Sequence, residues 1–389
     1  MDPIYLDHAA TTPVRPEILE AMLPYLQTAW GNPSSAHRLG RTARAGLEQA
    51  KRETAEALGV EPNEVIFTSG GTEADNLAII GAAFAARAAG RPMHVVTSSI
   101  EHKAALAAAH AVRRMGGIET ILPVDGNGIV SLEALDAVLP ENPALVSVMW
   151  VNNEVGVVQP MEEIGARCRA AGVPLHSDGV QAFGKIPIDL EAVGVSLLSI
   201  SGHKIGAPKG IGALIVRNRK IIEAIQHGGG QQFGIRPGTE NVAGAVALGR
   251  AALLAVRELE EHTTRLKALR DRLCQRLKEV VPELYIHCSD APRAPHVLSV
   301  SIPGAEAEAL LMHLDLAGIC VSAGSACSTG SVEPSHVLVA MGLEEPLALT
   351  TLRFSLGHET TAEEIDRVVE VFPSVVARVK ELGVSLGRA

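Results

Sequence analysis

The chain has 389 residues, of which 47% are hydrophobic and 20% charged, and its formal net charge is −10. This length and composition predict one large or two ordinary domains with a substantial core, and the negative charge argues against a protein that binds nucleic acid by neutralising phosphates. No apolar run approaches the roughly 18 residues needed to span a bilayer, and "MDPIYLDHAA" lacks the apolar stretch of a secretory signal, so we expect a cytoplasmic protein with no membrane or nucleic-acid partner.

Short apolar runs alternate with longer helical segments in the first part of the chain. The runs that predict strands are 64–69, 93–99, 144–151, 173–178, 196–201 and 212–217. Helical segments such as "TEADNLAIIGAAFAARAAG" lie between most of them and stop at glycine. Strands separated by helices predict βαβ units and a mainly parallel, buried sheet. Ligands of such sheets bind beyond the carboxyl ends of the strands.

The pattern changes after the last of these runs. Residues 241–281 form one long helical segment, in which we expect a break near His262. The shorter apolar runs that follow predict an α+β module, and its final helix is announced by a capping box from Thr361 to Glu364. The long helical segment therefore bridges two predicted domains.

Residues that bind anions or charged rings follow two of the predicted strands. In "FTSGGTEADN" (67–76) a strand runs into Gly70, Gly71 and Thr72 and then a helix, which aims free N–H groups and a hydroxyl at an anion such as phosphate. The alternative is a glycine turn with an ordinary helix cap at Thr72. In "HSDGVQ" (176–181), Asp178 can accept from a cationic ring nitrogen and Gln181 can bond a neighbouring oxygen; the alternative is a helix-capping aspartate.

A lysine and three further polar residues lie at or just beyond the ends of two more predicted strands, 196–201 and 93–99. Lys204 lies three residues beyond a strand in "SLLSISGHKIGAPKG" (196–210), where partial desolvation lets a lysine form a Schiff base. Ser201 and His203 flank it and can bind phosphate. His102, in "SSIEHKA" (98–104), can stack on a planar cofactor or move protons. Taken singly, Lys204 could instead be a solvated loop lysine, and His102 could be a structural histidine.

Together these residues describe one site. A lysine for an aldehyde, a carboxylate for a pyridinium nitrogen and donors for a phosphate are the groups that pyridoxal 5′-phosphate requires. The sequence therefore predicts a site for that cofactor at the carboxyl edge of the sheet, and no metal site.

The chain has five cysteines and no CxxC spacing, so neither a disulfide framework nor a zinc module is indicated. Cys168 and Cys274 lie in helical patterns, and Cys320 lies in a predicted strand. Only Cys327, within "SAGSACSTGS" (322–331), lies in a segment with the composition of a mobile loop. Cys327 is therefore either a nucleophilic thiol or an incidental thiol in a strand-to-helix turn.

The chain resembles the NifS/IscS-type cysteine desulfurases, in the class V branch of fold-type I pyridoxal-phosphate enzymes. The similarity runs nearly end to end. The motifs that carry it are "YLDHAATTP" (5–13), "GNPSSAH" (31–37), "FTSGGTEADNLAI" (67–79), "EHKA" (101–104), "VNNEVGVVQ" (151–159), "SGHK" (201–204), "GIGAL" (210–214), "GGGQQFGIRPGTEN" (228–241), "SAGSACSTGS" (322–331) and "LRFSLG" (352–357).

The resemblance implies an α/β fold in two domains. A large cofactor-binding domain of residues 15–258 would contain a mainly parallel seven-stranded sheet flanked by helices. A smaller α+β domain of residues 1–14 and 259–389 would carry the cysteine loop. The resemblance also implies a homodimer.

The resemblance assigns a role to each candidate residue. Lys204 would hold the cofactor as a Schiff base and carry the Cα proton, and Cys327 would be the nucleophile. Asp178 would bind the pyridinium nitrogen and Gln181 the phenolic oxygen, while His102 would stack on the ring and transfer protons. Asn153 and Arg353 would bind the substrate carboxylate. The phosphate would be bound by Gly71, Thr72, Ser201, His203 and, from the neighbouring subunit, Thr239.

The activity implied is the removal of sulfur from L-cysteine. It would give L-alanine and a persulfide on Cys327, for delivery to an iron–sulfur scaffold or a thiolation partner. The alternatives are a selenocysteine lyase, another class V enzyme such as an aminotransferase or a kynureninase-like hydrolase, and a protein that acts chiefly as a docking component of a sulfur-transfer complex.

Overall fold

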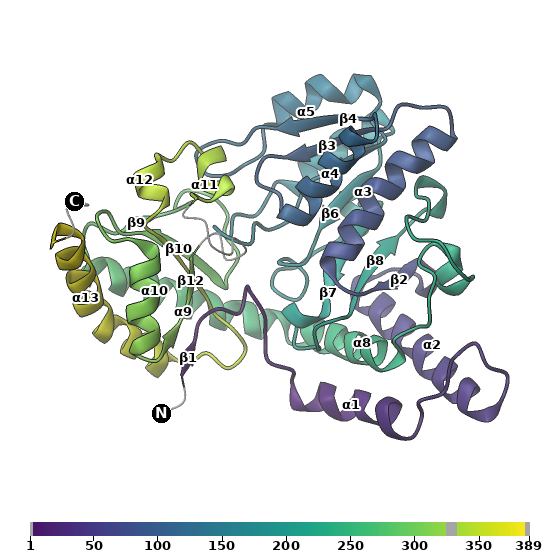
Figure 1. The fold of residues 1–389 in the computed structure, drawn as a ribbon, viewed down its shortest axis with the longest axis horizontal. Helices are drawn as coiled ribbons and strands as arrows, with labels where there is room; N and C mark the ends of the chain where they lie inside the picture. The colour runs from purple at the N-terminus through teal and green to yellow at the C-terminus, as the bar shows by residue number, and fades with distance from the viewer. Residues whose placement is uncertain (1–2, 324–332, 386–389) are drawn as a thin grey trace.

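The computed structural model describes residues 3–323 and 333–385, which form two parts side by side (Figure 1). The larger part is built on a seven-stranded sheet in the order β2-β8-β7-β6-β5-β3-β4. Only β8 runs antiparallel to its neighbours, so the sheet is mainly parallel. In sheet order the strands are Val65–Thr68, Gly212–Val216, Leu197–Ser201, Leu175–Asp178, Leu145–Ser147, His94–Ser98 and Ile118–Leu122.

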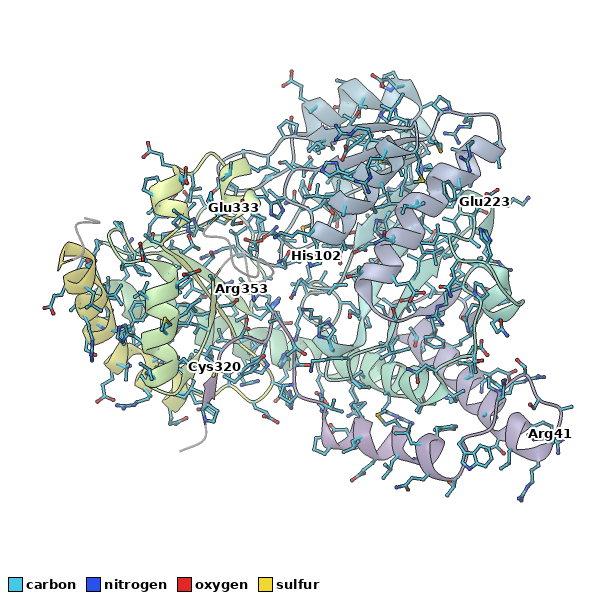
Figure 2. The ribbon with its side chains drawn as sticks, in the orientation of Figure 1. Arg41, His102, Glu223, Cys320, Glu333 and Arg353 are labelled. Atoms are coloured by element: carbon cyan, nitrogen blue, oxygen red, sulfur yellow. The ribbon has the colours of Figure 1, made fainter. Side chains whose placement is uncertain are left out.

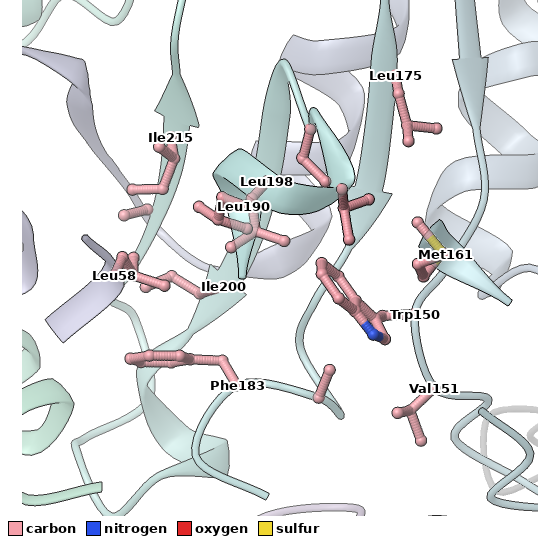
Figure 3. Close-up of a cluster of buried hydrophobic side chains, with 14 of the residues drawn as sticks. Leu58, Trp150, Val151, Met161, Leu175, Phe183, Leu190, Leu198, Ile200 and Ile215 are labelled. Atoms are coloured by element: carbon pink, nitrogen blue, oxygen red, sulfur yellow. The ribbon is translucent and has the colours of Figure 1, made fainter. Parts of the chain in front are cut away.

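Both faces of this sheet are buried, except along the edge strand β4. Val65 and Phe67 pack into one core cluster while Ile66, between them, packs into another. Since successive residues of a strand point to opposite faces, a strand covered on both sides is expected to carry apolar residues on both faces. This explains the continuous apolar runs of the sequence. Figure 3 shows part of the first cluster, in which Trp150 and Phe183 lie among aliphatic side chains.

Helices cover the two faces. α3 (Gly71–Ala88) and α4 (Lys103–Arg114) contribute to the cluster that contains Ile66. α2 (Arg38–Leu58), α6 (Met161–Ala171) and α8 (Val242–Arg257) contribute to the other. This part also contains α1 (Pro16–Gln27), α5 (Leu132–Val138) and α7 (Leu190–Val193).

The smaller part has its own core. An antiparallel sheet in the order β12-β13-β10-β9 packs against α9 (Leu259–Val280), α10 (Ala307–Leu316) and α13 (Ala362–Ser385). Its strands are Ser322–Ala323, Thr351–Ser355, Val297–Ser301 and Tyr285–Ile286. Two short helices, α11 (His336–Ala340) and α12 (Glu345–Ala348), complete it.

The N-terminal segment touches both parts. β1 (Ile4–Tyr5) pairs with β11 (Ile319–Cys320) of the smaller part. Downstream, the backbone N–H of Thr12 donates to the carbonyl of His203, just after β7 of the larger sheet, at 2.8 Å. Residues 6–12 therefore run along the junction of the two parts, where the strands of the larger sheet end.

Several sequence-based expectations need correction. The long helical segment breaks at Glu258, between α8 and α9, and not near His262; the Glu258 carboxylate is held there by Arg15 at 2.7 Å. A cap at Thr72 is also wrong, because α3 begins at Gly71 and Gly70 precedes it. The edge strand β4 was not singled out, since only its last residue, Leu122, is buried.

Other expectations are confirmed. The capping box is present, because Thr361 N–H donates to the Glu364 carboxylate at 2.8 Å and Glu364 N–H donates to the Thr361 hydroxyl at 3.2 Å. Among the described residues, no helix combines the length and apolar character needed to cross a bilayer.

Candidate active site

A cavity of about 320 Å³ lies at the carboxyl edge of the larger sheet, against the smaller part. It collects every predicted site residue that the structure describes, except Thr239. These are Gly71, Thr72, His102, Asn153, Asp178, Gln181, Ser201, His203, Lys204 and Arg353. The carboxyl ends of parallel strands meet at one edge of a sheet, which is why residues far apart in sequence converge here.

Lys204 ends a single 3₁₀ turn (Gly202–Lys204) that follows β7 directly. Its Nζ donates to two backbone carbonyls of the N-terminal segment, Ala9 at 2.6 Å and Ala10 at 2.7 Å. These two carbonyl groups hold the amine at the cavity wall. A lysine presented in this way can react with an aldehyde once it loses its proton.

Asp178 is the last residue of β6 and is 5% exposed. Its carboxylate accepts from Val180 N–H at 2.8 Å. Burial raises the pKa of Asp178, and the nearby His102 and Lys204 oppose that rise. A cationic ring nitrogen beside this carboxylate would keep it ionised.

A second buried acid lies behind Asp178. Asp75, in the first turns of α3, is 1% exposed, and burial and the charge of Asp178 raise its pKa well above the usual range. Ligand atoms of Asp75, His102 and Asp178 lie within 4.8 Å of one another. Ligand atoms grouped in this way could also hold a metal ion. The sequence pattern did not single out Asp75, because acids near the N-terminus of a helix are ordinary.

Glycine and small polar residues surround one end of the cavity. A Cβ on Gly71 would lie 2.9 Å from Val180, so a side chain there would have to displace a neighbour. A Cβ on Gly71 would also lie 3.8 Å from the Cβ of Ser201, and His203 lines the same cavity. His203 is neutral, because burial lowers its pKa to about 4, and its Nδ1 lies 3.1 Å from the Thr11 hydroxyl. Free N–H groups and hydroxyls of this kind bind phosphate.

His102 and Arg353 line the cavity from the two sides of the junction between the parts (Figure 2). His102 caps α4, accepting from Ala104 N–H at 3.2 Å. Burial is the main cause that lowers its pKa. The ring therefore enters the cavity neutral and able to take a proton.

Arg353 projects from β13 and is 2% exposed. One Nη donates to the backbone carbonyl of Asn153, and the other pairs with the Asp7 carboxylate, each at 2.8 Å. These contacts fix a buried guanidinium at the cavity wall. A planar cation held there is suited to bind a carboxylate.

Other residues of the cavity carry no sequence signal that singles them out. Glu154 lines it and accepts a hydrogen bond from Ser335, and burial raises its pKa to about 7. Glu101, close by, accepts from Met149 N–H at 2.9 Å, and burial raises its pKa to about 8. His336 also lines the cavity and lies 2.9 Å from the Glu101 carbonyl.

The structure does not place two predicted residues in the cavity: one lies outside it and one is not described. Thr239 is exposed and does not line the cavity. Cys327 lies outside the described residues. The last described residues before that gap belong to β12 of the smaller part, in which Ser322 pairs with Arg353 of β13.

Known proteins with similar sequences cover almost the whole chain. The cysteine desulfurase IscS of Methanosarcina thermophila is 44% identical over 97% of this chain and 93% of its own length. The cysteine desulfurase IscS of Serratia proteamaculans is 46% identical over 98% of this chain and 94% of its own length.

Solved structures with the same fold also cover almost the whole chain. A structure described as a NifS-like protein superposes with a TM-score of 0.90, at 35% identity, covering 97% of this chain and all of that one. A second, described as SspA in complex with cysteine, has a TM-score of 0.80 at 34% identity, covering 91% of this chain and 98% of that one. The family described as aminotransferase class-V matches residues 4–368. The chain belongs to this family and, within it, to the NifS/IscS-type cysteine desulfurases.

Proposed function

We propose that the protein is a pyridoxal-phosphate-dependent cysteine desulfurase that moves sulfur from L-cysteine to its own Cys327. The observation that carries the proposal is the convergence of Lys204, Asp178, Gln181 and Arg353 on one cavity. The similarity to cysteine desulfurases over nearly the full length supports it, as does the likeness to a structure described with bound cysteine.

The chemistry of the cavity fits the cofactor. A carbonyl-bound amine, a buried carboxylate and a glycine-lined helix N-terminus stand along one cavity of about 320 Å³. We assign Lys204 to the aldehyde, Asp178 to the pyridine nitrogen, Gln181 to the phenolic oxygen and His102 to the ring face. Gly71, Thr72, Ser201 and His203 would hold the phosphate, with Thr239 of a second subunit.

We assign each protein group a role that suits its surroundings. When bound, the cofactor supplies an electron sink for the Cα of an attached amino acid. Arg353, with Asn153, orients the substrate carboxylate. Lys204 would take the Cα proton, and His102, neutral and partly buried, would exchange a proton near the ring. Asp178 keeps the ring nitrogen charged.

Sulfur transfer requires a thiolate. The Cys327 thiolate attacks the substrate sulfur, the S–Cβ bond breaks, and its electron pair returns to the substrate carbons, which are protonated to give L-alanine. The sulfur remains on Cys327 as a persulfide. We further propose that the persulfide is delivered to an iron–sulfur scaffold or another sulfur acceptor, and that the protein works as a cytoplasmic homodimer.

The two cores support the proposed domain division. The cluster of the smaller part contains Leu6 together with residues from Leu266 to Val379, which is consistent with a small domain of residues 1–14 and 259–389 and a large domain of residues 15–258.

The test is turnover of L-cysteine by the purified protein under reducing conditions. We expect equal amounts of alanine and sulfide, and loss of both products in Cys327→Ala. Normal turnover by Cys327→Ala would refute the persulfide route. Turnover of L-selenocysteine alone would instead favour a selenocysteine lyase.

A further inference from the structure

The side chain of Gln181 is held between two segments from opposite ends of the chain. Its Nε2 lies 2.9 Å from the carbonyl oxygen of Ala9, in the N-terminal segment. Its Oε1 lies 3.1 Å from Nε2 of His296, the residue before β10 of the smaller part. Gln181 is 4% exposed and His296 is 1% exposed, so water does not compete for these contacts.

The Ala9 carbonyl fixes which way the Gln181 amide faces. A carbonyl oxygen only accepts, so the amide atom 2.9 Å from it must be the NH₂ group. The amide oxygen must then face His296. Since that oxygen also only accepts, His296 must carry its proton on Nε2.

The environment of His296 keeps its ring neutral. Burial lowers the pKa of His296 well below its usual range, and the positive charges of Lys185 and Arg353 lower it further. A single proton is thus available to the ring, and the contact with Gln181 places it on Nε2. Nδ1 is buried and has no hydrogen-bond partner among the described residues.

We propose that His296 is a positioning residue that holds the Gln181 amide with an N–H, and not its carbonyl oxygen, directed into the cavity. Nε2 of Gln181 carries two protons. One goes to Ala9, and no other described residue accepts the second. Gln181 lines the cavity, where a phenolic oxygen needs a donor. The inference rests on the proposed function, because it concerns the contact of Gln181 with pyridoxal phosphate.

His296 is itself well anchored for this task. Its carbonyl accepts from Leu356 N–H at 2.8 Å, which extends the pairing of β10 with β13. The same strand β13 carries Arg353. The smaller part therefore supplies both the proposed carboxylate ligand and the group that orients the amide of the larger part.

The test compares three substitutions in the full-length protein. His296→Leu removes the donor with little change in size, and His296→Gln returns an N–H at about the place of Nε2. His287→Leu is the matched control, because His287 is also 1% exposed, also bonds through Nε2 (to Ser301, 2.8 Å) and does not line the cavity. The readouts are the affinity for pyridoxal phosphate and the pH midpoint of the near-visible absorbance of the loaded protein.

We expect His296→Leu to bind the cofactor up to about tenfold more weakly, the worth of one lost hydrogen bond. We also expect its pH midpoint to rise, because a phenolic oxygen without a donor holds a shared proton more tightly. His296→Gln should recover both values, and His287→Leu should change neither. Equal behaviour of His296→Leu and the wild type would overturn the inference, as would a failure of His296→Gln to recover either value.

Folding and the proposed function are controlled separately. If His296→Leu does not fold, His296→Asn replaces it, because its shorter amide stays polar but falls short of Gln181. The cofactor affinity and pH midpoint of His296→Asn are then compared with those of His296→Gln, and this comparison tests the inference. A wild type that takes up no cofactor refutes the proposed function, whereas normal loading with unchanged variants refutes the role of His296 alone.

Discussion

Replacing Lys185 with methionine should make the protein more stable at neutral pH. Lys185 is 6% exposed and lines a second, smaller cavity of about 60 Å³ beside His8 and His262. The described residues offer its ammonium no ion pair. A buried charge without a partner destabilises the folded state, and methionine retains the straight side chain without the charge.

The pKa of Lys185 sets the magnitude. Burial lowers it from 10.5 to about 8. Each pH unit corresponds to about 1.4 kcal/mol, so below pH 8 the buried charge costs about 3 kcal/mol of folding free energy. Between pH 8 and 10.5 the unfolded chain binds more protons than the folded one, so this cost falls as the pH rises.

Calorimetric unfolding of the wild type and Lys185→Met at about pH 7, 9 and 10 measures this dependence. We expect the variant to be more stable by about 1–3 kcal/mol at pH 7, and the difference to shrink towards pH 10.5. The exposed Lys220 provides the control, since Lys220→Met should show no such dependence. A difference that stays constant with pH, or a variant less stable than the wild type at pH 7, would show that the reasoning is wrong.

Three further substitutions test other parts of the account. Lys204→Ala should abolish the borohydride-sensitive absorbance near 400–430 nm. Lys209 is an exposed lysine of the next loop, so Lys209→Ala should keep this absorbance. A Lys204→Ala protein that retains the band would contradict the assignment of Lys204. Arg353→Gln should raise KM for L-cysteine by about 10–100-fold, the worth of a charged hydrogen bond, with cofactor absorbance unchanged; an unchanged KM would remove Arg353 from the substrate site. Thr361→Ala should lower the free energy of unfolding by about 1 kcal/mol through loss of the capping box, as measured by thermal unfolding, and an unchanged melting temperature would show that the cap contributes nothing.

Residues that follow parallel strands were the most predictable part of the site. Asp178 ends β6, and Lys204 follows β7 within one turn. The topology alone requires their side chains to meet at one edge. Short-range patterns therefore identify both residues, together with Gln181 and His102, from the sequence alone.

Contacts made across the junction of the two parts could not be predicted in this way. Lys204 is held by the carbonyls of Ala9 and Ala10, and a backbone carbonyl leaves no trace in residue types. His296 and Gln181 are 115 residues apart in sequence. Buried acids such as Glu154 were missed for a related reason: tertiary burial alone raises their pKa, and the local sequence does not reveal it.

The most direct test of the central claim is mass spectrometry of the protein after brief treatment with L-cysteine, followed by alkylation and digestion. The account predicts a mass increase of about 32 Da, one added sulfur atom, on the peptide that contains Cys327. It also predicts that no peptide containing Cys168, Cys274, Cys288 or Cys320 gains this mass. A sulfur atom found on one of those peptides, or on none while alanine accumulates, would contradict it.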